Sequence, residues 1–553
     1  MQINVTTHGG DNLSAQEIFE AILKSRGHLS KKDQDDFLSP PKPTLKILIK
    51  ETGLKLSTLK NIKNLLDQHL ALGHDICVFG DYDADGITAT ATLWQALMAY
   101  AKGGKSRILP FIPDRTRHGY GLSIKAVGDI IEGDGFKTTS FPDFSPKLIL
   151  TVDNGIVAHE AASVLAKKGI DLVITDHHQV SDTLPEAKVI LHTTATSGAG
   201  IAWIFSLYLL EENQFSRDLL DLATIGVVAD MMPLFGLNRS LVVYGLAKLA
   251  TSKRLGLLAL YQAAKVDPPG ISTYTISFGL APRINAAGRL YDPYDALRLL
   301  CATKLSLATQ LASKINAHNQ DRQELTDLAL SSLSKETFTH KIIVVIGDYH
   351  EGIIGLIAGK LTELTHKPAI VMSNHSNSLK ASARSVPGVN ITELLRSLSL
   401  SYLSLGGHSQ AAGFALAKDQ ESIFLQTIYD LADTTIPDAL LENNLTVDFE
   451  LTPSQITLAL AKLIEQLSPF GIGNPKPKFL LRNVVVLEDR QLGTTGKHRK
   501  LTIESGDKSL EVLLFNTKEP YPLKTITNLV GSIDINVWNN KERVQLIGSY
   551  VEN

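Results

Sequence analysis

Between residues 71 and 300, short apolar runs alternate with stretches that are long enough to form helices. The runs at 75–79, 147–152, 171–175 and 188–191 are rich in Val, Ile and Leu. Apolar strands joined by crossover helices are typical of a parallel sheet. The pattern therefore predicts an α/β domain with a parallel sheet over residues 71–299.

The remaining chain shows other patterns. Residues 1–70 predict short helices around a proline-rich turn, as an N-terminal helical extension. Residues 300–335 lack Gly and Pro and have apolar positions at nearly helical spacing, which predicts a long connecting helix. Its polar insert at 318–322 either faces a cleft or forms a solvated surface. We expect a second, smaller α/β unit over 336–435 and a small β-barrel over 436–553.

The composition is that of an ordinary globular protein with several domains. The chain has 553 residues, 44% hydrophobic and 20% charged, which is too long for a single core. Only two cysteines occur, Cys77 and Cys301, which argues against a disulfide framework and favours a reducing cytoplasm. We see no signal-peptide pattern and no membrane-spanning run, so a cytoplasmic protein is expected. The net charge of −3 neither requires nor excludes a nucleic-acid partner.

Four runs that contain carboxylates or histidines follow apolar runs. They contain Asp81, Asp83 and Asp85; Asp153; Asp176, His177 and His178; and Asp230. Acidic groups that follow buried strands lie at the carboxyl edge of a parallel sheet, where such folds bind ligands. Oxygen and imidazole ligands together suit divalent cations. The sequence therefore predicts a site for two such ions, with each run at a strand end.

Other interpretations of these runs need weighing. The spacing of Asp81, Asp83 and Asp85 resembles the start of an EF-hand loop, but Thr92 stands where that loop needs Glu. A solvated turn is another interpretation. In an extended segment, Asp83 and Asp85 would point to the same side and share a site. Asp230 is the weakest signal when it is taken alone, because it could be a helix N-cap or a partner in an ion pair.

These motifs resemble those of the DHH phosphoesterase superfamily. The matching runs are Asp-Tyr-Asp-Ala-Asp-Gly at 81–86, Val-Asp-Asn-Gly at 152–155, Asp-His-His at 176–178 and Val-Ala-Asp at 228–230. Further runs resemble the RecJ family of that superfamily. They are Ser-Gly-Ala-Gly at 197–200, Pro-Arg-Ile-Asn-Ala-Ala-Gly-Arg at 282–289, His-Glu-Gly-Ile-Ile-Gly at 350–355, Ser-Ala-Arg-Ser at 382–385 and Gly-Gly-His-Ser-Gln-Ala-Ala-Gly at 406–413.

The resemblance covers nearly the whole chain and implies a DHH domain, a DHHA1 domain and an oligonucleotide-binding (OB) barrel. It implies a 5′→3′ exonuclease that is specific for single-stranded DNA, releases 5′-mononucleotides and acts in DNA repair and recombination. A helicase and a single-strand-binding protein are the implied protein partners.

The resemblance also implies roles for individual residues. Two Mn²⁺ or Mg²⁺ ions would be held by Asp83, Asp85, Asp153, His177, His178 and Asp230, with Asp81 and Asp176 as ligands or as groups that orient them. DNA phosphates would be held by Arg115, Arg283, Ser382 and Arg384, and His408 would reach into the cleft. In the barrel, Lys497, Arg499, Lys500 and Trp538 are candidates for contacts with a single strand. An ordinary charged hairpin turn, with Trp538 in the core, would explain these four barrel residues equally well.

The chain departs from the family pattern at a few positions. Phe79 stands where some relatives have His, His192-Thr193 replaces a common Asn-Pro, and Ala381 and Ala383 replace glycines. The alternative functions are a DHH phosphodiesterase for short RNA or cyclic dinucleotides, a manganese pyrophosphatase, and a non-enzymatic Cdc45-like scaffold. Small substrates would need neither the N-terminal extension nor the barrel. The arginine and Gly-Gly-His motifs argue against a pyrophosphatase, and the complete set of metal ligands argues against a scaffold. The sequence does not determine which metal is bound, whether DNA or RNA is preferred, how processive the enzyme is, or what its oligomeric state is.

Overall fold

The computed structural model describes residues 2–7, 13–133, 141, 143–334, 336–374, 378–493, 496–517 and 525–552. It consists of two compact units. One contains Met1–Thr44, Met231–Tyr244 and Asn444–Asn553, and the other contains Leu45–Asp230 and Gly245–Asn443. The division at Tyr244 falls within helix α11 (Gly236–Ala250). No helix in the described part of the chain has the length and apolarity needed to cross a membrane.

The larger unit contains the predicted parallel sheet. Its five strands, in the order β3-β2-β4-β5-β6, are all parallel. They are β2 (Asp75–Phe79), β3 (Ile108–Phe111), β4 (Pro146–Thr151), β5 (Asp171–Asp176) and β6 (Val189–His192). The chain builds outwards from β2 to β3 on one side and from β4 to β6 on the other, so the order reverses between β2 and β4. Ligands of such sheets bind beside this reversal, at the carboxyl ends of the strands.

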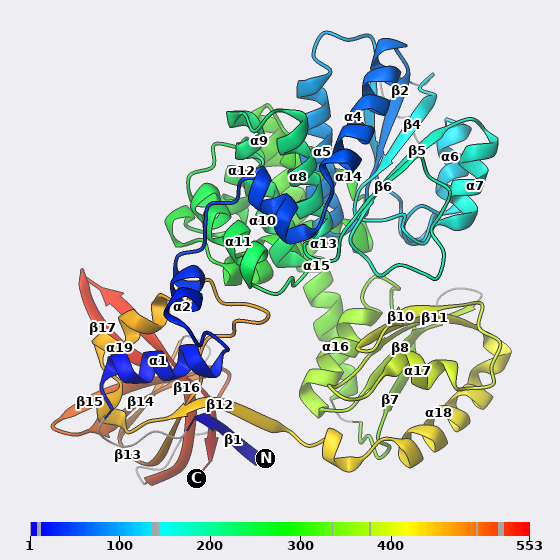
Figure 1. The fold of residues 1–553 in the computed structure, drawn as a ribbon. Helices are drawn as coiled ribbons and strands as arrows, with labels where there is room; N and C mark the ends of the chain where they lie inside the picture. The colour runs from blue at the N-terminus through cyan, green and yellow to red at the C-terminus, as the bar shows by residue number, and fades with distance from the viewer. Residues whose placement is uncertain are drawn as a thin grey trace. The chain divides into compact units, whose positions relative to one another are not determined.

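Helices cover both faces of this sheet (Figure 1). On one face, α6 and α7 share an apolar core with β2, β4 and β5, and Phe79 stacks on Phe111 there. Phe79 is therefore a core residue, completely buried. The helices of this part are α3 (Leu45–Thr52), α4 (Leu56–Ala71), α5 (Ala84–Tyr100), α6 (Ile124–Ile131), α7 (His159–Lys167), α8 (Gly198–Leu209), α9 (Gln214–Asp218), α10 (Leu220–Ala229), α12 (Leu255–Ala264), η2 (Pro268–Gly270), η3 (Thr275–Leu280), α13 (Ala281–Leu290) and α14 (Tyr294–Leu300).

A long helix, α15 (Leu305–Leu333), leads to the second sheet of the same unit. This sheet has the order β10-β11-β9-β8-β7, and only the β7–β8 pair is parallel. One face packs on α17 and α18, and the other on α16 and the end of α15. The elements are β7 (Ile343–Gly347), α16 (Ile354–Thr365), β8 (Ala369–Ser373), β9 (Ser378–Arg384), α17 (Ile391–Arg396), β10 (Ser404–His408), β11 (Ala411–Ala417), η4 (Lys418–Gln420), α18 (Glu421–Thr435) and η5 (Asp438–Leu440).

The smaller unit contains the predicted barrel. Strands β13, β14, β15, β17 and β16 pair in this order, and β16 returns to β13 to close the barrel. Alternate residues fill its core, as the alternating sequence pattern predicted. The elements are β1 (Gln2–Thr7), α1 (Ala15–Ser25), α2 (Lys31–Leu38), β12 (Asn444–Glu450), η6 (Pro453–Gln455), α19 (Leu458–Glu465), β13 (Phe479–Leu492), β14 (His498–Ser505), β15 (Lys508–Leu514), β16 (Thr525–Trp538) and β17 (Lys541–Glu552).

The N-terminal segment differs from the predicted helical extension over residues 1–70. It begins with strand β1, which pairs in parallel with β12. Ile18, Phe19 and Ile22 of α1 are buried in the core of the barrel unit, whereas α3 and α4 belong to the larger unit. The segment therefore divides near residue 44, because its first helices bury their apolar faces against the C-terminal barrel, which is distant in sequence.

Candidate metal centre

The first acidic run joins β2 to α5 and is not extended, so the predicted alternation of Asp83 and Asp85 is wrong. Asp83 is the N-cap of α5, and its Oδ1 accepts a hydrogen bond from the backbone N–H of Gly86 at 2.9 Å. Asp85 lies in the first helical turn. The backbone N–H of Ala84 donates to Asn285 Oδ1 of α13 at 2.8 Å, so a second helix fixes the loop. Both carboxylates thus stand at a helix N-terminus, where backbone N–H groups without helical partners are available to them.

Asp85 is held by the N-terminus of α8. Its carboxylate accepts hydrogen bonds from Ser197 Oγ at 2.8 Å and from the backbone N–H groups of Gly198 at 2.8 Å and Ala199 at 3.0 Å. Three donors fix this buried side chain in one orientation. The Ser-Gly-Ala-Gly run, to which the sequence assigned no role, therefore positions Asp85.

Asp153 follows β4 and has a backbone φ of 65°, in the left-handed region that non-glycine residues rarely occupy. Its Oδ1 atom is buried and accepts no hydrogen bond from any residue that the structure describes. That atom nevertheless lies 3.0 Å from His177 Nε2. Strain of this kind concentrates at functional sites, and an unsatisfied carboxylate oxygen next to an imidazole nitrogen suits a shared cation.

His177 and His178 follow β5, as predicted. The preceding residue, Asp176, accepts hydrogen bonds on Oδ1 from the backbone N–H groups of both histidines and from the ring Nδ1 of His178. Its Oδ2 accepts a hydrogen bond from the backbone N–H of Ile156. These hydrogen bonds outweigh burial and lower the pKa of Asp176. Because both oxygens are already engaged, Asp176 orients the histidines and is a poor candidate for a metal ligand.

The hydrogen bonds of His178 define which nitrogen faces the site. Burial opposes its protonation, but the hydrogen bond and charge of Asp176 raise the pKa of His178 to about 9. Because Nδ1 is bound to Asp176, Nε2 is the atom available for other partners, and it lies 2.9 Å from the hydroxyl of Tyr120. No sequence pattern identified this tyrosine, which stands between Gly119 and Gly121 on the loop after β3.

Asp230 does not follow a strand, which corrects the prediction for this residue. It is the C-cap of helix α10, which is buried on all sides. A short, fully buried helix has the same apolar sequence as a buried strand, so the pattern could not distinguish them. The position still brings Asp230 to the site, with Oδ2 3.7 Å from His177 Nε2.

The structure brings these residues together from four separate segments. His177 Nε2 is central: besides Asp153 and Asp230, it lies 3.9 Å from Asp85 Oδ2. Three sets have ligand atoms within 4.8 Å of one another: Asp153, His177 and His178; Asp85, His177 and Asp230; and Asp81, Asp83 and Asp153. Every predicted ligand except Asp176 belongs to at least one set.

In this cluster the repulsion between carboxylates outweighs the positive charge near them. Burial and then the charge of Asp83 raise the pKa of Asp81 to about 8, and burial with the charges of Asp85 and Asp83 raises the pKa of Asp230 to about 8. The pKa of Asp153 is raised well above the usual range for the same reasons. Divalent cations would relieve this repulsion, and the oxygen and imidazole donors match Mn²⁺ or Mg²⁺.

A glycine in α10 allows this close packing, which leads to a prediction. A Cβ atom on Gly226 would lie 2.3 Å from Asp85 Oδ1 and 2.4 Å from the Cβ of Ala199. We therefore expect Gly226→Ala to lower the free energy of unfolding by about 1–3 kcal/mol and to weaken Mn²⁺ binding. Urea denaturation and Mn²⁺ titration measure the two effects. Gly128→Ala on α6, where a Cβ meets nothing within 4 Å, is the matched control; equal behaviour of the two variants would contradict the assignment.

The predicted phosphate-binding residues occupy both parts of the larger unit. Arg115 follows β3, and its guanidinium lies 5.4 Å from the centre of the Tyr82 ring. Arg384 Nη1 donates to Ser382 Oγ at 3.1 Å on strand β9. Both side chains face Gly355 at the start of α16, where a Cβ would lie 3.0 Å from Ser382 Oγ and 3.2 Å from Arg384 Nη2. The burial of Arg384, and then the charge of Arg115, lower the pKa of Arg384, so these guanidiniums are neighbours.

Among the described residues, no hydrogen bond or ion pair joins the side chains of His408 and Arg283 to Arg115, Ser382 or Arg384. His408 ends strand β10 and is exposed, and no hydrogen bond or ion pair joins its side chain to the carboxylate cluster among the described residues. Arg283 of α13 donates to Asn316 Oδ1 at 2.9 Å and to the carbonyl of Gly279 at 2.7 Å. The role of His408 therefore remains a prediction.

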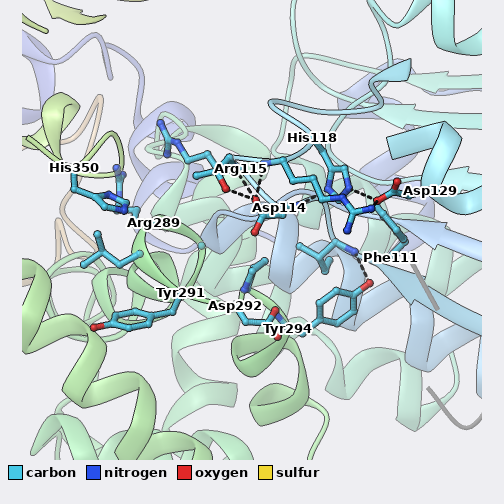
Figure 2. Close-up of a pocket in the computed structure, with 16 residues that line it drawn as sticks. Phe111, Asp114, Arg115, His118, Asp129, Arg289, Tyr291, Asp292, Tyr294 and His350 are labelled. Carbon is cyan, nitrogen blue, oxygen red and sulfur yellow. Dashed lines mark hydrogen bonds and ion pairs between the residues drawn. The ribbon is translucent and has the colours of Figure 1, made fainter. Parts of the chain in front are cut away.

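A cavity of about 580 Å³ lies between the loop after β3 and the end of α13 (Figure 2). Arg115, Arg289 and His350 gather at one end of it. At the other end His118 and Arg117 both contact Asp129, at 2.8 and 2.6 Å. Neither Arg115 nor Arg289 forms an ion pair with any described carboxylate, so their end of the cavity is suited to an anion. Arg289 was part of a recognised motif, but the sequence assigned it no role.

The barrel candidates divide into buried and exposed residues. Arg499 points into the barrel and binds Asp489 through two hydrogen bonds of 2.7 Å, so its guanidinium is not available to a DNA strand. Lys500 pairs with Glu511 at 2.6 Å. Lys497 is exposed, and Trp538, at 75% exposure, is not a core residue. Exposed aromatic and basic groups remain suitable for a single strand.

Comparison with known proteins assigns a family to each part of the chain. Residues 75–227 match the family model for the N-terminal domain of the DHH family, residues 339–434 match the DHHA1 domain, and residues 447–549 match the RecJ OB domain. These three matches fall on the parallel sheet, the second sheet and the barrel. The fold class that the sequence predicted is therefore confirmed.

Named relatives agree with these matches. The chain is 30% identical to the single-stranded-DNA-specific exonuclease RecJ of Escherichia coli, over 89% of this chain and 90% of the relative. It is 32% identical to RecJ of Bacillus subtilis over 89% of this chain, and the alignment spans 63% of that protein. The crystal structure of Thermus thermophilus RecJ in complex with Mn²⁺ superposes with a TM-score of 0.82 at 27% identity, covering all of this chain and 79% of that one. The chain belongs to the RecJ family of single-stranded-DNA-specific exonucleases.

Proposed function

We propose that this protein removes 5′-mononucleotides from single-stranded DNA, in the 5′→3′ direction, by hydrolysis that depends on two divalent metal ions. The observation that carries the proposal is the convergence of carboxylates and imidazoles from four segments on His177 Nε2. Family membership supports the substrate, since the relatives are named for single-stranded DNA. The Mn²⁺-bound and Mg²⁺-bound relatives support the cofactor.

The residues divide into groups with separate tasks. Asp81, Asp83, Asp85, Asp153, His177, His178 and Asp230 would hold the ions, and Asp176 would fix the histidines. Bound ions supply a nucleophile at neutral pH and stabilise the charge that develops on the phosphoryl oxygens. Arg115, Ser382 and Arg384 would grip the phosphate, because a guanidinium fork binds two phosphate oxygens at once.

A strand-degrading enzyme of this kind has predictable partners. Because it acts on single strands, we propose that a helicase and a single-strand-binding protein present its substrate in the cytoplasm. The barrel would bind the single strand through exposed groups such as Trp538 and Lys497. A cyclic dinucleotide or very short RNA would need no such barrel, which argues against the small-substrate alternative.

Labelled oligonucleotides test the proposed function. With Mn²⁺ or Mg²⁺, a 5′-labelled single strand is expected to release its label as a mononucleotide, and a 3′-labelled strand is expected to shorten stepwise from its 5′ end. A blunt duplex or excess chelator should suppress both reactions. Release of 3′-terminal mononucleotides, or equal rates in chelator, would contradict the proposal.

A further inference from the structure

Two aromatic side chains lie exposed just before α13. Tyr274 and Phe278 are 71% and 68% exposed, the highest values among the described aromatic side chains of the larger unit. Their ring centroids are 4.6 Å apart with the planes tilted by 33°, so the rings form one continuous surface. Phe278 lies in η3, a π-helical turn, and such turns occur frequently at functional sites. Exposed aromatic surface is costly in water, which suggests a ligand.

A pair of arginines lies beside this aromatic surface. Arg283 Nη1 donates to the carbonyl of Gly279, one residue after Phe278. Arg322 belongs to the polar insert of α15, and its Nε is buried without a hydrogen-bond partner among the described residues. Burial, and then the nearby charge of Arg283, lower the pKa of Arg322. Neither arginine forms an ion pair with a described carboxylate, so two adjacent cations lack an anion.

We propose that Tyr274 and Phe278 form a stacking platform for the bases of the bound single strand. Arg322 holds phosphates beside this platform, next to Arg283, for which the family resemblance already implies phosphate binding. This proposal rests on the exonuclease function proposed above and adds a contact site outside the metal centre. Aromatic rings beside a cationic track are the combination with which proteins bind single strands without sequence preference. Neutral apolar partners would leave the arginine charges unmatched, so the chemistry favours nucleic acid over a protein surface.

The position of the platform sets where on the strand it would act. Helix α13 begins at Ala281, directly after η3, and carries Asn285, which binds the backbone of the metal loop at Ala84. Seven residues separate Phe278 from Asn285, which is about 10 Å along a helix axis. A stacked strand rises about 3.4 Å per nucleotide, so the platform would meet bases about three nucleotides from the scissile bond. Its contribution should therefore grow with strand length.

Binding measurements on strands of different length test the platform. In chelator, where no hydrolysis occurs, fluorescence anisotropy gives the Kd of the full chain for labelled strands of two to sixteen nucleotides. We expect Phe278→Ala to weaken binding of an octanucleotide by roughly five- to one-hundred-fold, with a smaller loss as the strand shortens to a dinucleotide. Phe278→Trp should retain affinity, whereas Phe278→Leu should lose it, because only the former preserves a ring. Phe215→Ala removes an exposed phenylalanine from α9 of the same unit and is the matched control.

Two further readouts distinguish stacking from a structural role. A 2-aminopurine base at the third nucleotide should be quenched by the wild type and not by Phe278→Ala. Arg322→Gln should reduce the slope of log Kd against log salt concentration by about one, which corresponds to the loss of one phosphate contact. The platform is refuted if Phe278→Ala and Phe215→Ala have the same Kd for strands of every length. It is also refuted if Phe278→Ala weakens binding by the same factor at every length, or if the variant changes only self-association. Inactivity of the wild type towards all single strands would instead refute the proposed function.

Discussion

Replacing His177 with alanine is expected to reduce the rate of mononucleotide release by at least about a thousandfold at saturating Mn²⁺. Its Nε2 atom lies within 3.0 to 3.9 Å of carboxylate oxygens from Asp153, Asp230 and Asp85. No other described histidine has this position, since His178 Nε2 is turned towards Tyr120. Loss of the shared ligand would therefore affect both ions, and water would replace a nitrogen that the fold holds in place.

The control for this variant is His159→Ala. His159 lies on α7 of the same unit, and its ring contacts Ser181 at 2.9 Å, outside the cluster. The rate of the control should equal that of the wild type, and both variants should keep the wild-type circular dichroism spectrum. A His177→Ala enzyme that retains more than a tenth of the wild-type rate at saturating metal would refute the central role of this imidazole.

Asp153→Asn is expected to have opposite effects on stability and activity. Burial, and then the charges of Asp85 and Asp83, raise the pKa of Asp153 well above its usual range. The folded, metal-free protein therefore retains protons that the unfolded chain has already released. The contribution of these carboxyl groups to stability is greatest below the ordinary carboxyl pKa, near 4, and is lost as the pH rises towards the raised values, which are about 8 for Asp81 and Asp230. A neutral amide at position 153 removes part of this penalty.

Denaturation of the metal-free protein in chelator measures this prediction. At pH 8 we expect Asp153→Asn to raise the free energy of unfolding by about 1–3 kcal/mol, with a smaller gain at pH 5. In the wild type, Mn²⁺ should restore the lost stability, by about 2.7 kcal/mol at one hundred times its Kd, whereas the variant should gain much less. Exonuclease activity of the variant should be abolished. An unchanged or lower stability at pH 8 would show that the repulsion inferred at this site is absent.

The parallel sheet and the acidic edge could be predicted because strands that are buried on both faces leave a continuous apolar signal. Asp153 and His177 follow such strands, and their meeting is a consequence of sheet topology alone. Asp230 needed the tertiary structure, because its buried helix α10 has no amphipathic period. The same holds for β1, whose pairing partner β12 lies more than four hundred residues away.

Side-chain direction explains the other differences. Arg499 and Lys500 are equally basic in sequence, but they alternate along β14, so the former points into the barrel and the latter faces outwards. Asp176 looked like a ligand beside two histidines, and only its hydrogen bonds showed that both oxygens are occupied. Ser197 and Asn285 position the metal loop from distant helices, and no local pattern reveals such a contact.

Anomalous diffraction from crystals soaked in Mn²⁺ tests the central claim most directly. We expect two Mn²⁺ peaks among Asp81, Asp83, Asp85, Asp153, His177, His178 and Asp230, with Asp176 bound to neither ion. At saturating Mn²⁺, the absence of peaks there, or peaks only on other parts of the surface, would contradict it.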